Sequence, residues 1–223
     1  NAMSIIDVAA GMLVNTVLLD DIDLGAANPW GVAVTPDGKT ICVTHSGTQE
    51  MSVIDAEGMH AKLNEVPNTI EEAKAAGRYD NRGTYSSVVK TDIPNDLAFL
   101  VGLRRRIGLE SSNPWAVVED AEKVNGPRGL AVIGRKAYAA VYFSDLIAVV
   151  DLDSPQRRPV TLIELGPRPQ LTKARRGEMH FHDAALCFQH WQSCASCHPD
   201  ARVDALNWDL MNDGMGNPKN NRS

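Results

Sequence analysis

The 223-residue chain lacks long apolar runs, an excess of basic residues and a dense set of cysteines. No run approaches the ~18 apolar residues that a membrane-spanning helix needs, so no such helix is expected. The 22 Lys and Arg stand against 28 Asp and Glu, and this net charge of −6 gives no reason to expect a nucleic-acid-binding surface. The four cysteines are too few and too clustered for the disulfide framework of a small secreted fold.

Short sequence patterns repeat along the first three quarters of the chain. The stretch SIID at 4–7 recurs as SVID at 52–55 and, in degenerate form, as AVVD at 148–151. A second stretch, NPWGVAV at 28–34, is echoed by GPRGLAV at 126–132, and each copy is followed by a polar turn and a β-prone run. Short strands in evenly spaced units of about 40–50 residues are typical of β-propeller blades.

These repeats resemble those of YVTN-type propellers from bacterial surface and periplasmic proteins, over about residues 4–60 and 126–166. We therefore expect a mainly β fold in which residues 1–167 form an incomplete β-propeller with a helical insertion near 67–77. Residues 168–223 would begin a small α-helical, cytochrome c-like haem domain. A generic β-meander or sandwich is the alternative for the β part.

Two or three blades do not complete a ring of four to eight. We therefore expect the chain to be a fragment of a longer protein whose exposed blade edges are covered, either by contact with the other domain or by self-association. The basic run Arg104–Arg105–Arg106 lies between the clear repeats. It is interpreted as a solvated turn or surface face, with an anion contact as the alternative.

Three of the four cysteines lie within eleven residues near the end of the chain, and two of them precede a histidine. Cys194, Cys197 and His198 form Cys-x-x-Cys-His, the attachment signature of c-type haem. Two thiols about one helical turn apart reach the two vinyl groups of the porphyrin and form thioethers. The imidazole that follows is then placed under the iron as its proximal ligand.

The same region leaves a zinc site open as an alternative, because it holds seven potential metal ligands. These are His180, His182, Cys187, His190, Cys194, Cys197 and His198. Their spacing matches neither a ribbon of paired cysteines nor a Cys₂His₂ finger. Trp191 is a candidate apolar contact for a porphyrin, with ordinary packing as the alternative. Arg175 or Arg176 is a candidate partner for the porphyrin propionates, with surface exposure as the alternative.

The surrounding residues resemble the bacterial di-haem cytochrome c peroxidase family, from about residue 172 onward. There a run R-G-x-x-x-F-x-D precedes S-C-x-x-C-H by about ten residues, and here Arg176 to Asp183 occupy the matching positions. The stretch GNPKN at 216–220 resembles a later segment of the family. The resemblance implies covalent haem c, electron transfer, a periplasmic or cell-surface location, and a redox partner protein or a small oxidant such as peroxide.

The chain also departs from that family. It carries one Cys-x-x-Cys-His, and no histidine follows His198 to serve as a distal iron ligand. Met211 or Met215 could ligate the iron there, with packing as the alternative, and His180 and His182 are weaker candidates. The acidic and glutamine groups that the family uses for peroxide cleavage have no counterpart, so the resemblance names no catalytic residue in this chain.

Two functions follow from these patterns. The first is an extracytoplasmic redox protein in which a propeller scaffold carries a haem c domain. The second is a non-enzymatic surface propeller that binds a protein or glycan partner, with the Cys/His cluster as a structural zinc site. Haem c attachment needs dedicated machinery, so recombinant protein made without that machinery could lack the group.

Overall fold

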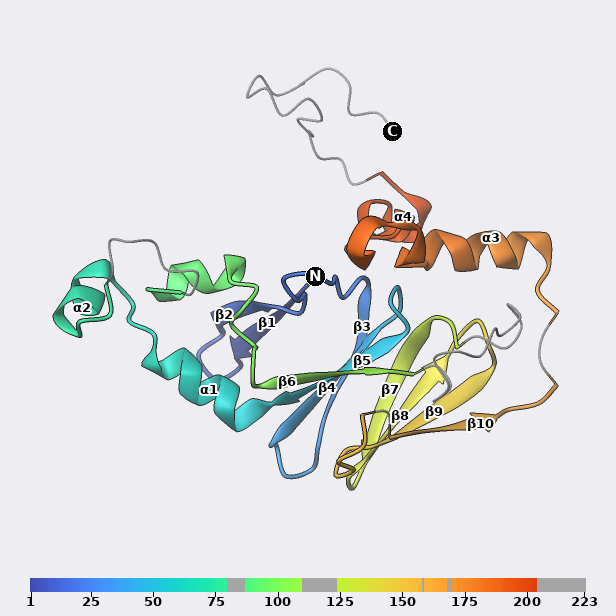
Figure 1. Cartoon of the computed structure of the whole chain (residues 1–223), viewed down its shortest axis with the longest axis horizontal. Coiled ribbons are helices and arrows are strands. Elements are labelled where there is room, and N and C mark those ends of the chain that lie inside the picture. The colour runs from blue at the N-terminus through green and yellow to red at the C-terminus, as the bar shows by residue number, and fades with distance from the viewer. Residues whose placement is uncertain (80–86, 110–123, 158, 168–169, 204–223) are drawn as a thin grey trace, which may run out of the picture.

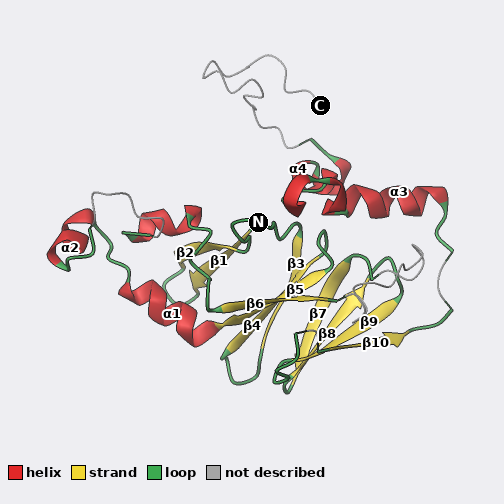
Figure 2. Ribbon diagram, viewed as in Figure 1, coloured by secondary structure: helices red, strands yellow, loops and turns green. Residues whose placement is uncertain are grey.

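The computed structural model describes residues 1–79, 87–109, 124–157, 159–167 and 170–203. These residues form a mainly β fold with short helices at its margins, which confirms the expected fold class at that level (Figures 1 and 2). Within the described ranges, no helix is long and apolar enough to cross a membrane.

The strands make three antiparallel sheets in which neighbours along the chain are neighbours in the sheet. The smallest pairs β1 (Ala2–Asp7) with β2 (Met12–Leu18). The second contains β3 (Pro29–Val34), β4 (Thr40–His45), β5 (Glu50–Asp55) and β6 (Arg104–Gly108). The third contains β7 (Pro127–Ile133), β8 (Lys136–Val141), β9 (Leu146–Asp151) and β10 (Val160–Glu164). The described strands form no closed ring.

Local sequence explains the tight turn between β3 and β4. Pro36 presets the backbone for a turn, and Gly38 adopts the positive φ of 75° that most side chains disfavour. The amide of Thr35 donates to the carbonyl of Thr40 (2.9 Å), and the hydroxyl of Thr35 donates to Asp37 (2.5 Å). Contacts within the turn therefore help to set the register of the hairpin.

The main core lies between the two four-stranded sheets. Cys42, Met51 and Ile107 project from the β3–β6 sheet, and the β7–β10 sheet contributes a row of small and branched side chains. These are Ala137, Ala139, Val141, Leu146, Ala148 and Val150, each buried. Alternation along β4 sends the neighbours of Cys42 to the opposite face, as the two-residue period of a strand requires.

A second core lies on that opposite face of the β3–β6 sheet. Val43 and Ile54 pack there with Met59 and Leu63 of α1 (Ala56–Glu65). A short helix, α2 (Ile70–Ala75), follows within the interval 67–77 where the sequence predicts one, and the Thr69 hydroxyl accepts from the amide of Glu72. Lys90–Asn95 forms a 3₁₀ helix before β6.

The end of the described chain is helical. It contains α3 (Lys173–His182), α4 (Cys194–Cys197) and three single 3₁₀ turns, at Ala184–Leu186, Phe188–His190 and Pro199–Ala201. Figure 1 shows α3 and α4 together across one end of the two larger sheets. This helical end segment, residues 170–203, contacts the loops at that end of the sheets.

The packing between the sheets predicts a large difference between two isoleucines. Ile107→Ala should lower the free energy of unfolding by about 2–5 kcal/mol, because Ile107 is fully buried between the sheets. Ile133→Ala, at a side chain that is 69% exposed on β7, should change it by less than about 0.5 kcal/mol. Urea unfolding of both variants checks this, and equal losses would show that the sheets do not pack as described.

Candidate functional site

The Cys-x-x-Cys-His residues lie on α4 and directly after it. Ser193 and Ser196 cap the helix, with the amide of Ser193 donating to the hydroxyl of Ser196 (3.0 Å). The amide of His198 donates to the carbonyl of Cys194 (2.9 Å), which closes one helical turn. Because positions three apart share one side of a helix, the two cysteines face the same way, and both thiols are free.

The imidazole of His198 is held by a backbone carbonyl. Its Nδ1 lies 3.1 Å from the carbonyl oxygen of Arg202. A proton on Nδ1 satisfies that oxygen and leaves the lone pair on Nε2, the nitrogen that an axial histidine offers to iron. Two free thiols one turn apart and an imidazole oriented in this way fit a covalent haem.

The other ligand candidates are not brought together in the same way. In the part of the chain that the structure describes, no three His, Cys, Asp or Glu side chains are grouped so as to hold a metal ion. His180 is exposed, whereas His182 packs its ring against Trp30 and Phe181. Met211 and Met215 lie outside the described residues. No described geometry therefore favours the zinc alternative.

Asn28, at the start of β3, joins the helical end segment to the sheet. Its side-chain amide donates to the carbonyl of His182 (2.9 Å) and to the hydroxyl of Ser193 (2.7 Å). Its carbonyl oxygen accepts from the hydroxyl of Ser196 (2.8 Å). Asn28 has a positive φ of 56°, a conformation that asparagine tolerates better than most residues. One residue thus fixes both α3 and the N-terminal cap of α4.

Backbone contacts complete the docking of the helical end segment. The amide of Gly25 donates to the carbonyl of Gln189 (2.7 Å), and the amide of Ala184 donates to the carbonyl of Gly47 (2.9 Å). A Cβ at position 25 would lie 2.5 Å from the carbonyl oxygen of His190 and against the Cα of Trp191. Gly25 is therefore required by close backbone approach.

Two arginines of the basic run 104–106 have buried side chains, so the interpretation as a solvated face is wrong for them. Arg104 and Arg106 have side chains only 3% and 8% exposed, on one face of β6, and both pair with the carboxylate of Asp21. Arg106 also pairs with Glu50. Arg105, on the opposite face of the strand, donates to the carbonyl oxygen of Ser154, in the segment between β9 and β10. The two-residue period of the strand separates these partners.

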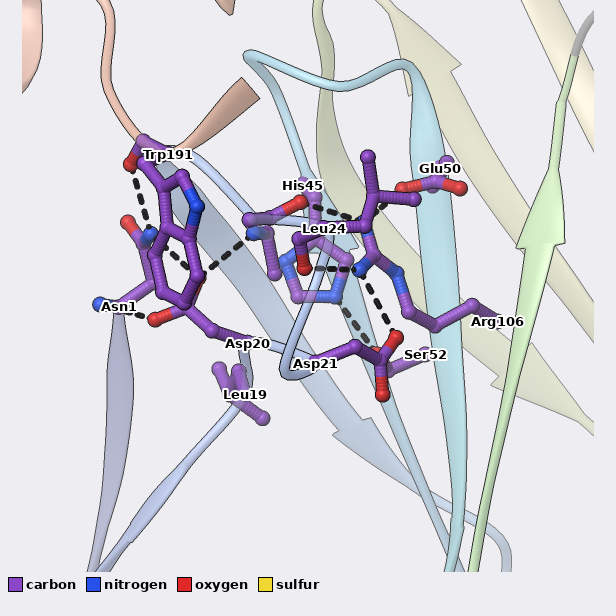
Figure 3. Close-up of polar contacts among 12 residues, drawn as sticks. Asn1, Leu19, Asp20, Asp21, Leu24, His45, Glu50, Ser52, Arg106 and Trp191 are labelled. Carbon is purple, nitrogen blue, oxygen red and sulfur yellow. Dashed lines mark hydrogen bonds and ion pairs between the residues drawn. The ribbon is translucent and has the colours of Figure 1, made fainter. Parts of the chain in front are cut away.

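The two buried guanidinium groups also bind the backbone of the loop at 19–28, and Figure 3 shows these contacts for Arg106. Arg104 donates to the carbonyl of Leu19 (2.5 Å). Arg106 donates to the carbonyls of Leu24 (2.8 Å) and Gly25 (2.6 Å). The same loop therefore contacts the arginines on one side and the helical end segment on the other.

His45 lies fully buried beside these arginines. Its Nε2 is 2.7 Å from the hydroxyl of Ser52. Burial, together with the positive charges of Arg106 and Arg104, lowers the pKa of His45 to about 3. The ring therefore stays neutral at any pH at which the protein is expected to work, and it serves as a buried hydrogen-bonding group.

Sequence reasoning located the thiols and His198 but missed Asn28, Gly25 and the buried arginines. The one signal for Asn28 was its place at the start of the repeated stretch 28–34, and Gly25 lies three residues before that stretch. Of the two propionate candidates, Arg175 is already engaged, since it donates to Glu178 (2.7 Å) and to the carbonyl of Tyr142 (3.1 Å).

No protein-family model matches the chain, and no curated protein matches it. Solved structures that align with it include hydrazine synthase from Kuenenia stuttgartiensis, at 21% identity and a TM-score of 0.48 over 68% of this chain and 34% of that one. A candidate 6-phosphogluconolactonase from Bacteroides uniformis ATCC 8492 aligns at 12% identity and a TM-score of 0.35, over 74% and 37%. The chain spans little more than a third of each of these proteins.

The close approach at Gly25 predicts a local loosening of the helical end segment. Gly25→Ala should displace residues 184–198 from the sheet, because backbone atoms rather than flexible side-chain ends oppose the new methyl group. Hydrogen exchange should rise there at least tenfold. Gly166→Ala is the matched control, since a Cβ there meets nothing within 4 Å. Unchanged exchange in Gly25→Ala would contradict this docking.

The buried His45 predicts an acid-dependent loss of stability. The pKa of His45 is about 3 in the folded protein and ~6.5 when unfolded, so protons favour the unfolded chain between these values. The free energy of unfolding should fall by about 1.5 kcal/mol from this group between pH 6.5 and pH 5. Urea unfolding of His45→Gln should show a smaller fall over that range, and equal pH slopes would refute the assignment.

Proposed function

We propose that this chain is an extracytoplasmic electron-transfer protein that carries covalent haem c and resembles the di-haem cytochrome c peroxidases. Cys194 and Cys197 would hold the porphyrin, and His198 would be the proximal iron ligand. The observation that carries this proposal is the pair of free thiols on one turn of α4, followed by an imidazole whose Nδ1 lies against a carbonyl.

The bound haem supplies an iron that takes up and releases one electron at a time. The residues of the chain attach and orient it. The two thiols would hold the porphyrin through thioether bonds to its vinyl groups, and the carbonyl of Arg202 would keep the proton of His198 on Nδ1, away from the iron-binding nitrogen. Asn28 and Gly25 hold the site against the sheets, so that the group keeps one position while it exchanges electrons.

The β part is proposed to be an incomplete propeller. Each four-stranded sheet has the consecutive meander order of a blade, and β3 approaches β7 closely. The pair β1–β2 would be the last two strands of a further blade. Among the described strands, β10 lies at the edge of the third sheet and its Ile163 is exposed, which supports coverage of that edge or self-association through it.

Location and partners follow from the proposed haem. Covalent attachment accompanies export, so we infer a periplasmic or cell-surface location. The partner would be a redox protein or a small oxidant such as peroxide. Whether the whole protein is a peroxidase depends on groups that this chain does not supply.

Protein made with haem-attachment machinery should be coloured and should show a sharp α band after reduction. His198→Ala should keep the covalent group but alter this band and shift the midpoint potential, since the proximal nitrogen is lost. His60→Ala is the control, because His60 is an exposed histidine on α1. Colourless wild-type protein from such cells would refute the proposal.

A further inference from the structure

Arg128, on β7, lies in a stack of aromatic rings beside the helical end segment. Its guanidinium carbon is 4.3 Å from the ring centre of Trp30, 4.0 Å from that of Tyr142 and 5.2 Å from that of Phe143. Aromatic faces attract a cation but accept none of the hydrogen bonds that lie in the guanidinium plane. The rings therefore hold Arg128 in place, but its in-plane N–H groups need hydrogen-bond acceptors from elsewhere.

One edge of Arg128 has no partner. Its Nε and Nη2 atoms are buried and make no hydrogen bond, and no carboxylate in the described ranges pairs with the side chain. The N–H groups of these two atoms point the same way, with the spacing of the two oxygens of a carboxylate. Burial lowers the pKa of Arg128, yet arginine stays protonated. This edge is a built half of a bidentate ion pair.

A cavity of about 560 Å³ adjoins this arginine. Trp30 and Arg128 line it on the sheet side, Phe181 and His182 of α3 line another side, and Asp200 lies two residues beyond His198. Its size is that of a site for a small organic ligand. The sheet, α3 and the residues after the Cys-x-x-Cys-His motif thus share one cavity.

The other charged groups around the cavity leave Arg128 as its unpaired cation. Glu178 lines the cavity but accepts a hydrogen bond from Arg175 (2.7 Å), and the Nδ1 of His182 lies 2.9 Å from the carbonyl of Glu178. Asp200 is exposed to solvent. A ligand with a carboxylate at one end and an apolar body would match the cation and the rings.

We propose that Arg128 binds a carboxylate that enters this cavity, through its Nε and Nη2 edge. Resting on the function proposed above, the carboxylate is a propionate of the haem attached at α4. A free carboxylic acid ligand is the other source of the same chemistry. Because both atoms of this edge are buried, the guanidinium has to turn within its ring stack before the edge faces the cavity.

The test on the haem-loaded protein is the pH dependence of its midpoint potential. An arginine partner keeps a propionate ionised, so Arg128→Gln should raise the pH at which the potential changes by at least one unit, a tenfold gain in proton affinity. Arg128→Lys keeps a positive charge, so the pH at which its potential changes should lie between those of the wild type and Arg128→Gln. This variant also tests the assignment if the glutamine variant folds poorly. Arg135→Gln is the control, because Arg135 is a partly exposed arginine that pairs with Asp153 and does not line the cavity. A profile unchanged in both Arg128 variants would overturn the propionate assignment.

A second arm distinguishes the sources of the carboxylate. Benzoate is titrated into haem-free Cys194→Ala/Cys197→Ala protein by calorimetry, with and without Arg128→Gln. Binding that Arg128→Gln weakens tenfold or more supports a free carboxylate ligand, even if no haem ever attaches and the proposed function fails. An unchanged potential profile together with no Arg128-dependent benzoate binding overturns the carboxylate site altogether.

Discussion

The carboxylate of Asp21, held by Arg104 and Arg106, is the interaction on which the arrangement of this molecule depends. Two buried guanidinium groups on one strand would be costly without partners, because their charges repel and water is excluded. Asp21 supplies the opposite charge, and backbone carbonyls of the loop at 19–28 accept further hydrogen bonds from both arginines. The arginines thereby hold that loop in one conformation against β6.

The loop at 19–28 in turn fixes the position of the candidate site. Gly25 and Asn28 lie at its far end, and their backbone and side-chain hydrogen bonds receive the segment that contains Ser193 and α4. Charge pairing in the β3–β6 sheet therefore decides where the thiols and His198 lie. A haem on α4 would be positioned by the sheets as much as by its own helix, and the cavity beside Arg128 lies between the two.

The parts of the fold and site that depend on neighbours in sequence could be predicted, and the parts that depend on distant partners could not. The Cys-x-x-Cys-His motif and the Pro36–Gly38 turn depend only on neighbouring residues, so both could be predicted from the sequence. The burial of Arg104 and Arg106 was not, because their partner Asp21 lies more than 80 residues away and three basic residues in a row are typical of a surface. The predicted distal ligands, Met211 and Met215, lie outside the described residues and stay predictions.

The most direct test of the account is peptide mass spectrometry of protein produced with haem-attachment machinery. The account predicts that the proteolytic peptide containing residues 194–198 carries the mass of one haem, and that Cys42 and Cys187 stay unmodified. It also predicts that the modification survives acid and organic extraction, as a pair of thioether bonds does. An unmodified 194–198 peptide from cells that load other c-type cytochromes would contradict the central claim.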